Sequence, residues 1–202
     1  MSSSLLAMGV FTLVGAITPG PVNVLALRHG AARSRLSSGL YVLGASTSYA
    51  AVVWTMGRGA QWLTQALPQL SAAAQWLCAA YLLWLAWRLA NAPVGEAQAQ
   101  DRSGAGHQLA ALLQGAAVQT LNPKAWLVAL AGVGLFVLPQ ADAAQALLRF
   151  CAISLMACLI GVGCWALMGR LLSGWLRTPQ RRRLFHRLLA LLLVASVAAM
   201  LA

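Results

Sequence analysis

The sequence has very few acidic residues, because Glu96, Asp101 and Asp142 are the only three in 202 positions. Charged residues of both signs make up only 8% of the chain, whereas soluble domains carry about 25%. A soluble protein of this length needs many more charged groups to cover its surface. The composition therefore excludes a soluble globular domain, and the 60% share of hydrophobic residues indicates an integral membrane protein.

The sequence also lacks the residue clusters of a metal site or an active site. None of its four cysteines forms a C-x-x-C pair, and all four lie inside apolar runs, which excludes a disulfide framework or a zinc site. We interpret them as small core residues. A membrane enzyme would need clustered histidines or carboxylates within the membrane, and the sequence shows none. We therefore predict neither an enzyme nor a bound cofactor.

The apolar residues cluster into long runs, and a run of about 20 residues can cross a bilayer. They predict an all-α membrane domain that spans the whole chain, 1–202, with six transmembrane helices. An alternative with five crossings, in which one hydrophobic segment does not cross, stays open. The predicted segments lie near residues 5–27, 38–60, 68–90, 109–137, 143–170 and 184–202.

The net charge of +11 would ordinarily suggest a nucleic-acid partner. Here the cations lie between apolar runs, as they do in cytoplasmic loops, so we expect a lipid bilayer as partner and no nucleic acid. The loops after the first, third and fifth segments are therefore predicted to be cytoplasmic, with both termini periplasmic. Their arginines are Arg28, Arg33, Arg35, Arg88, Arg102, Arg170, Arg177, Arg181, Arg182, Arg183 and Arg187.

The polar stretch 91–108 predicts a flexible cytoplasmic linker between two halves, 1–90 and 109–202. The halves share a weak internal similarity, because T-P-G-P at 18–21 aligns with T-L-N-P at 120–123. Each half has three apolar segments, and since three is odd, the second half must enter the membrane inverted. Two inverted three-helix repeats are the plan of many secondary transporters.

Prolines interrupt the first and fourth segments near their middles. Thr18, Pro19, Gly20 and Pro21 form the first break, and Asn122 with Pro123 forms the second. A proline removes a backbone donor, and the freed carbonyls need partners or a wet cavity. Both breaks resemble helix starts, with Thr18 and Asn122 as N-caps and the next proline at the first helical position. Their positive ends are expected to form a site for a substrate carboxylate, and plain kinks are the alternative.

Lys124, the only lysine in the chain, directly follows the second break. A cation at membrane depth is costly and is a functional candidate, so our hypothesis is that Lys124 binds the substrate carboxylate; pairing with backbone carbonyls is the alternative. Asn23 offers a donor and an acceptor, either for the substrate amino group or for a contact between helices. No segment contains an acid, so a transported proton must use Lys124, His29 or the substrate. We expect His29 itself to be a solvated histidine at the cytoplasmic mouth.

Several motifs resemble the LysE/RhtB family of amino-acid exporters. They are T-P-G-P-V-N at 18–23, Asn122-Pro123-Lys124, and A-Y-L-L-W-L-A-W at 80–87. F-V-L-P-Q at 136–140 and C-W-A-L at 164–167 are similar to the cysteine/O-acetylserine exporter branch. The first motif departs from the family at Val22, where many members carry Asn or Asp.

This resemblance implies a secondary transporter that exports amino acids or close derivatives, such as cysteine, O-acetylserine or another small neutral amino acid. Export would cross the bacterial inner membrane and use the proton gradient, and the resemblance also implies a homodimer. The alternative is a channel-like or regulatory membrane protein that does not work by alternating access. The sequence leaves the transported amino acid open.

Overall fold

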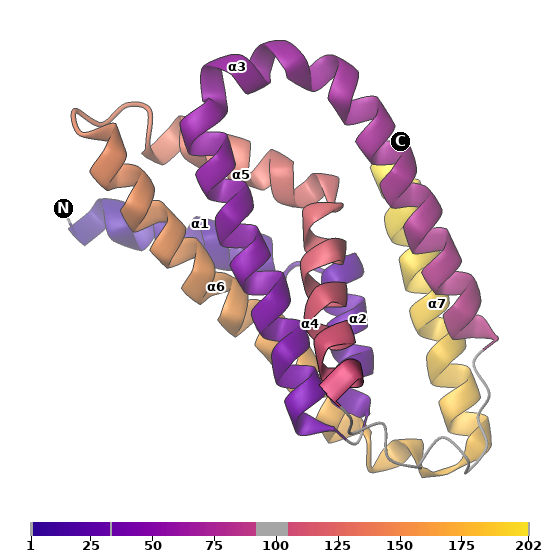
Figure 1. Cartoon of the computed structure of the whole chain (residues 1–202). Coiled ribbons are helices and arrows are strands. Elements are labelled where there is room, and N and C mark those ends of the chain that lie inside the picture. The colour runs from indigo at the N-terminus through magenta and orange to yellow at the C-terminus, as the bar shows by residue number, and fades with distance from the viewer. Residues whose placement is uncertain (1, 33, 92–104, 202) are drawn as a thin grey trace.

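The computed structural model describes residues 2–32, 34–91 and 105–201. Most of the predicted linker 91–108 lies outside these ranges. All regular secondary structure in the described ranges is helical (Figure 1), which confirms the prediction of an all-α protein.

The first and fourth predicted segments are both interrupted at their prolines. The first consists of α1 (Ser2–Ile17) and α2 (Pro21–Ala31), and the fourth consists of α4 (Ala105–Thr120) and α5 (Pro123–Phe136). Helices α1 and α2 meet at an angle of 67°. Because each second helix begins with a proline, no intrahelical donor is lost at its first position.

The predicted N-cap of the first break is wrong. Helix α2 begins at Pro21 rather than Pro19, and its N-cap is Gly20, whose backbone is extended with φ −174° and ψ 175°. The amide and the hydroxyl of Thr18 both donate to the carbonyl of Val14, so Thr18 completes the last turn of α1. The second break follows the prediction, because the Asn122 side chain accepts a hydrogen bond from the Lys124 amide at 3.2 Å.

The second and third predicted segments belong to one continuous helix, α3 (Arg35–Ala90). In Figure 1 this helix rises beside α4, curves over at the top of the view and descends beside α7. The predicted interruption between residues 60 and 68 is therefore wrong. Residues 61–67 read Q-W-L-T-Q-A-L and contain no glycine, and most of these residue types tolerate or favour a helix.

The last two segments are α6 (Ala143–Leu172) and α7 (Pro179–Leu201), which are joined by a short 3-10 helix, η2 (Trp175–Arg177). The Asp142 carboxylate caps α6 by accepting from the Gln145 amide at 2.9 Å. Helix α7 packs against α3 and also contacts α2 (Figure 1). Asp142 thus has a structural role at the start of α6.

Glycines bring two pairs of helices into backbone contact. A Cβ atom placed on Gly30 of α2 would lie 1.7 Å from the Ala166 carbonyl oxygen of α6, and one on Gly169 would lie 1.9 Å from the Leu27 oxygen. Gly44 of α3 and Gly115 of α4 approach the opposite backbone in the same way. Small residues at such contacts let membrane helices pack closely, and here they fix α2 against α6 and α3 against α4.

Within the described residues, two stretches have the length and apolar character to cross a membrane, 35–59 and 143–172. The bent pair formed by residues 5–17 of α1 and by α2 makes a third if it is counted as one span. Residues 79–90 and α5 are shorter apolar helices.

Candidate functional site

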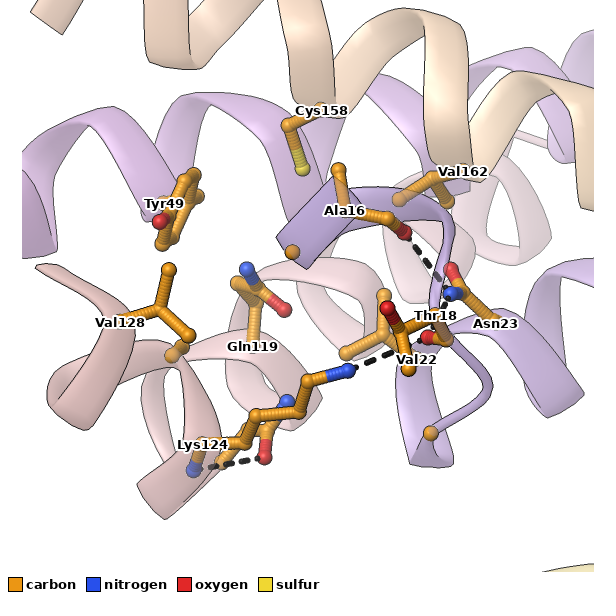
Figure 2. A pocket seen from close by; sticks show the side chains of 14 residues that line it. Ala16, Thr18, Val22, Asn23, Tyr49, Gln119, Lys124, Val128, Cys158 and Val162 are labelled. Atoms are coloured by element: carbon orange, nitrogen blue, oxygen red, sulfur yellow. Dashed lines mark hydrogen bonds between the residues drawn. The ribbon is translucent and has the colours of Figure 1, made fainter. Parts of the chain in front are cut away.

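The two proline breaks face one cavity of about 40 Å³ (Figure 2). A volume of this size holds on the order of three water molecules. Its lining comes from both breaks and from the helices α1 to α6. The lining residues are Gly15, Ala16, Thr18, Gly20, Val22, Asn23, Tyr49, Gln119, Asn122, Lys124, Ala125, Val128, Cys158 and Val162.

Two side chains, Asn23 and Trp165, donate hydrogen bonds to carbonyls that the first break frees. Asn23 Nδ2 donates to the carbonyl oxygens of Ala16 at 2.9 Å and of Thr18 at 2.8 Å. The Trp165 indole N–H donates to the carbonyl oxygen of Ile17 at 3.0 Å. Unpaired carbonyls are expensive within a bilayer, so these contacts stabilise the sharp turn between α1 and α2.

Lys124 connects the second break to the first. Its ammonium donates to the carbonyl oxygen of Thr18 at 3.2 Å, across 106 positions of sequence (Figure 2). The only acid in the described part of the chain is Asp142, which caps α6. The ammonium is half-buried and is balanced by a carbonyl dipole rather than by a carboxylate. An incoming anion would therefore find a cation without an ionic partner.

The backbone carbonyls near the second break accept hydrogen bonds from neighbouring side chains. The Trp126 indole N–H donates to the carbonyl oxygen of Thr120 at 2.6 Å. The hydroxyl groups of Ser48 and Thr120 lie 2.7 Å apart, and Ser48 also donates to the carbonyl oxygen of Ala116 at 3.1 Å. These contacts join the end of α4 to α3, so the break is held by a neighbouring helix.

Five of the eight predicted site residues line the cavity: Thr18, Gly20, Asn23, Asn122 and Lys124. The three predicted prolines, Pro19, Pro21 and Pro123, are not among its lining residues; they shape the backbone around it. The N-termini of α2 and α5 both border the cavity, and each contributes a partial positive charge.

His29 lies away from the cavity, at the end of α2. Its Nε2 atom lies 2.9 Å from Gln114 Oε1 of α4, and its ring stacks on Tyr41 with centroids 4.5 Å apart. The prediction of a freely solvated histidine is therefore wrong. Tyr41 is fully buried and donates to the carbonyl oxygen of Val22 at 2.9 Å, so His29 packs on a rigid support.

Sequence reasoning missed two polar residues of the cavity wall, Gln119 and Tyr49. Gln119 directly precedes the Thr-Leu-Asn-Pro break, and this neighbourhood was a usable signal. Tyr49 lies in the interior of α3, and only the folded structure brings it to the breaks.

A comparison with known protein families identifies the family of the chain. The profile of the "LysE type translocator" family matches residues 13–202. The chain belongs to the LysE translocator family. It is therefore a helical membrane protein of a transporter family rather than an enzyme, and the matched range includes both breaks.

The curated relatives of this LysE family member include several with one name. The chain is 33% identical to the "Cysteine/O-acetylserine efflux protein" of Salmonella choleraesuis and to that of Salmonella typhimurium, over 93% of this chain and 92% of each relative. It is 32% identical to the protein of that name from Escherichia coli O1:K1, with the same coverage. No solved structure matches the chain.

Proposed function

We propose that this protein is a secondary transporter that exports cysteine, O-acetylserine or another small neutral amino acid across the bacterial inner membrane. The names of its relatives give the substrate class. The observation that carries the proposal is the cavity between the two breaks, which combines a cation, two helix N-termini and backbone carbonyls. These groups are complementary to the carboxylate and the ammonium of a zwitterion.

The carboxylate binds at Lys124 in this proposal. Its negative charge replaces the neutral Thr18 carbonyl as the partner of the ammonium, and the positive ends of α2 and α5 add to the attraction. The released Thr18 carbonyl then accepts a hydrogen bond from the substrate ammonium. Asn23 donates through Nδ2 to the backbone, which leaves its Oδ1 atom as a second acceptor for the ammonium.

We infer that the chain crosses the membrane six times as two inverted repeats. If α1 corresponds to α4, α2 to α5, and the first arm of α3 to α6, three of the contacts between helices have counterparts. The contact of α1 with α6 corresponds to the contact of α4 with α3. The contact of α2 with α6 corresponds to the contact of α5 with α3. The contact of α1 with α5 matches that of α4 with α2. These pairings support the inverted repeat, and the distribution of arginines supports periplasmic termini.

Transport then proceeds by alternating access, with rocking of the two broken segments. The cavity holds about three water molecules, fewer atoms than an amino acid has, so it must widen on one side of the membrane at a time. Loss of the Lys124–Thr18 contact on substrate binding frees the two breaks from each other. We propose that the proton gradient drives this cycle, with Lys124, His29 or the substrate as the proton carrier.

Efflux from overexpressing cells tests the proposal. Cells are loaded with a panel of labelled small amino acids that includes cysteine and O-acetylserine, with and without a protonophore. We expect faster efflux of at least one of them than in cells that express Lys124→Ala, and loss of the difference with the protonophore. Equal efflux from both strains for every amino acid would contradict the proposed function. The homodimer stays a prediction, which cross-linking in membranes would test.

A further inference from the structure

Two polar side chains of the cavity wall lack a hydrogen-bond partner. Gln119 of α4 is 7% exposed and Tyr49 of α3 is 4% exposed, and both line the cavity. Within the ranges that the structure describes, neither the Gln119 amide nor the Tyr49 hydroxyl makes a hydrogen bond. Neither group is among the described buried atoms that lack a partner, so the polar atoms of both face the cavity rather than the packed core. Water or a ligand in the cavity is the source of their partners.

The other polar groups around the breaks are already engaged. Asn23 holds two backbone carbonyls, Asn122 caps α5, and Lys124 donates to the Thr18 carbonyl. These groups hold the backbone of the breaks or face the charged ends of a zwitterion. Gln119 and Tyr49 do not make these contacts, so their hydrogen-bonding groups are available to the side chain of the substrate.

The size of the cavity brings both groups within reach of one ligand. Both residues line the same cavity, so one ligand in it can contact both. Figure 2 shows the Gln119 side chain extending from α4 toward the middle of the lining residues, with Tyr49 on the side of the view opposite Asn23. With its carboxylate at Lys124 and its ammonium at the first break, an amino acid would direct its side chain toward Gln119 and Tyr49.

We infer that Gln119 and Tyr49 form a side-chain subsite that selects short substrates bearing a hydrogen-bonding atom, such as a hydroxyl, a thiol or an ester oxygen. The inference rests on the proposed function. An amide and a phenol can each donate and accept a hydrogen bond, so a donor atom or an acceptor atom of the substrate can pair with them. An apolar side chain of equal size leaves both groups buried and unpaired, which is the effective way for a site to reject it. The rest of this wall is formed by Val128, Cys158 and Val162, which limits the length of the side chain.

Competition between isosteric amino acids tests the subsite. Purified protein in proteoliposomes exchanges labelled O-acetylserine by counterflow, and the inhibition constants of threonine and valine are measured, because these two differ by a hydroxyl in place of a methyl group. We expect the wild type to favour threonine by about tenfold, which corresponds to one unpaired buried polar group. The preference should fall below about threefold in Gln119→Met and in Tyr49→Phe, with valine binding unchanged or tighter.

Gln145→Met is the matched control, because Gln145 is exposed at the start of α6 and away from the cavity; its preference should equal that of the wild type. Both test substitutions keep the size of the side chain, and each is an independent test if the other protein does not fold. An unchanged preference in a folded variant, or an equal loss for both inhibitors, would overturn the subsite. Absence of any O-acetylserine counterflow in the wild type would instead contradict that substrate of the proposed function.

Discussion

The Lys124 ammonium lies 3.2 Å from the Thr18 carbonyl oxygen, although 106 positions separate the two residues in sequence. This contact joins the two proline breaks, which come from opposite halves of the chain. Because the partner of the ammonium is a neutral carbonyl, a carboxylate competes for it effectively. The proposed transport cycle depends on this exchange of partners.

Substitution of Lys124 should therefore remove transport without unfolding the protein. We expect Lys124→Ala to lower the initial rate of amino-acid counterflow by more than tenfold, since one charge-assisted hydrogen bond contributes roughly 1.5–3 kcal/mol. Lys124→Arg keeps the charge and should retain part of the rate. Arg183→Ala, which removes an exposed cation of α7, is the matched control and should transport normally. A Lys124→Ala protein that exchanges at the wild-type rate would exclude a role for the ammonium.

Asn23 should contribute more to stability than an exposed asparagine does. Asn23→Leu leaves the Ala16 carbonyl without its donor, at a cost of roughly 1–3 kcal/mol for an unpaired group, and leaves the Thr18 carbonyl with Lys124 as its donor. Thermal unfolding in detergent should show a clearly lower midpoint. Asn91→Leu, at the exposed end of α3, should change the midpoint much less. Equal midpoints for the two variants would show that the first break does not depend on Asn23.

Substitution of glycine by alanine should change the stability of the protein in opposite directions at two positions. Gly30→Ala places a methyl group against the backbone of Ala166, so α2 and α6 must separate, at a cost of about 1–3 kcal/mol or more. Gly163→Ala, in the interior of α6 with open space around its Cβ position, should stabilise the helix by about 0.5–1 kcal/mol. Detergent unfolding midpoints of the two proteins should therefore move in opposite directions from that of the wild type. A stable Gly30→Ala protein would contradict the close packing.

The sequence was sufficient for the helical class and for the positions of both breaks, because apolar runs and prolines act locally. It predicted Asn122 as an N-cap correctly, since capping needs only neighbouring residues. It failed at Thr18, whose hydroxyl has two local choices and donates backward to Val14. It also missed Tyr49, because only the packing of α3 against the breaks reveals that this ring lines the cavity.

The orientation of the chain follows from its arginines and is open to a direct test. We predict that both termini lie in the periplasm, because eleven arginines follow the first, third and fifth segments. Alkaline phosphatase fused after Ala202 should be active, because it folds only outside the cytoplasm, and a fluorescent reporter that folds only in the cytoplasm should be dark. The same reporters fused after Asn91 should give the reverse pattern. An active cytoplasmic reporter at the C-terminus would overturn the predicted topology.

The most direct test of the central claim compares an amino acid with its methyl ester as competitors of counterflow in proteoliposomes. The ester keeps the ammonium and the side chain but lacks the carboxylate that Lys124 is proposed to bind. Serine should inhibit the wild type at least tenfold more strongly than serine methyl ester, as expected for one charge-assisted contact. This difference should disappear in the residual activity of Lys124→Ala and persist in Lys124→Arg, which keeps the positive charge. Equal inhibition of the wild type by the acid and the ester would contradict carboxylate binding between the two breaks.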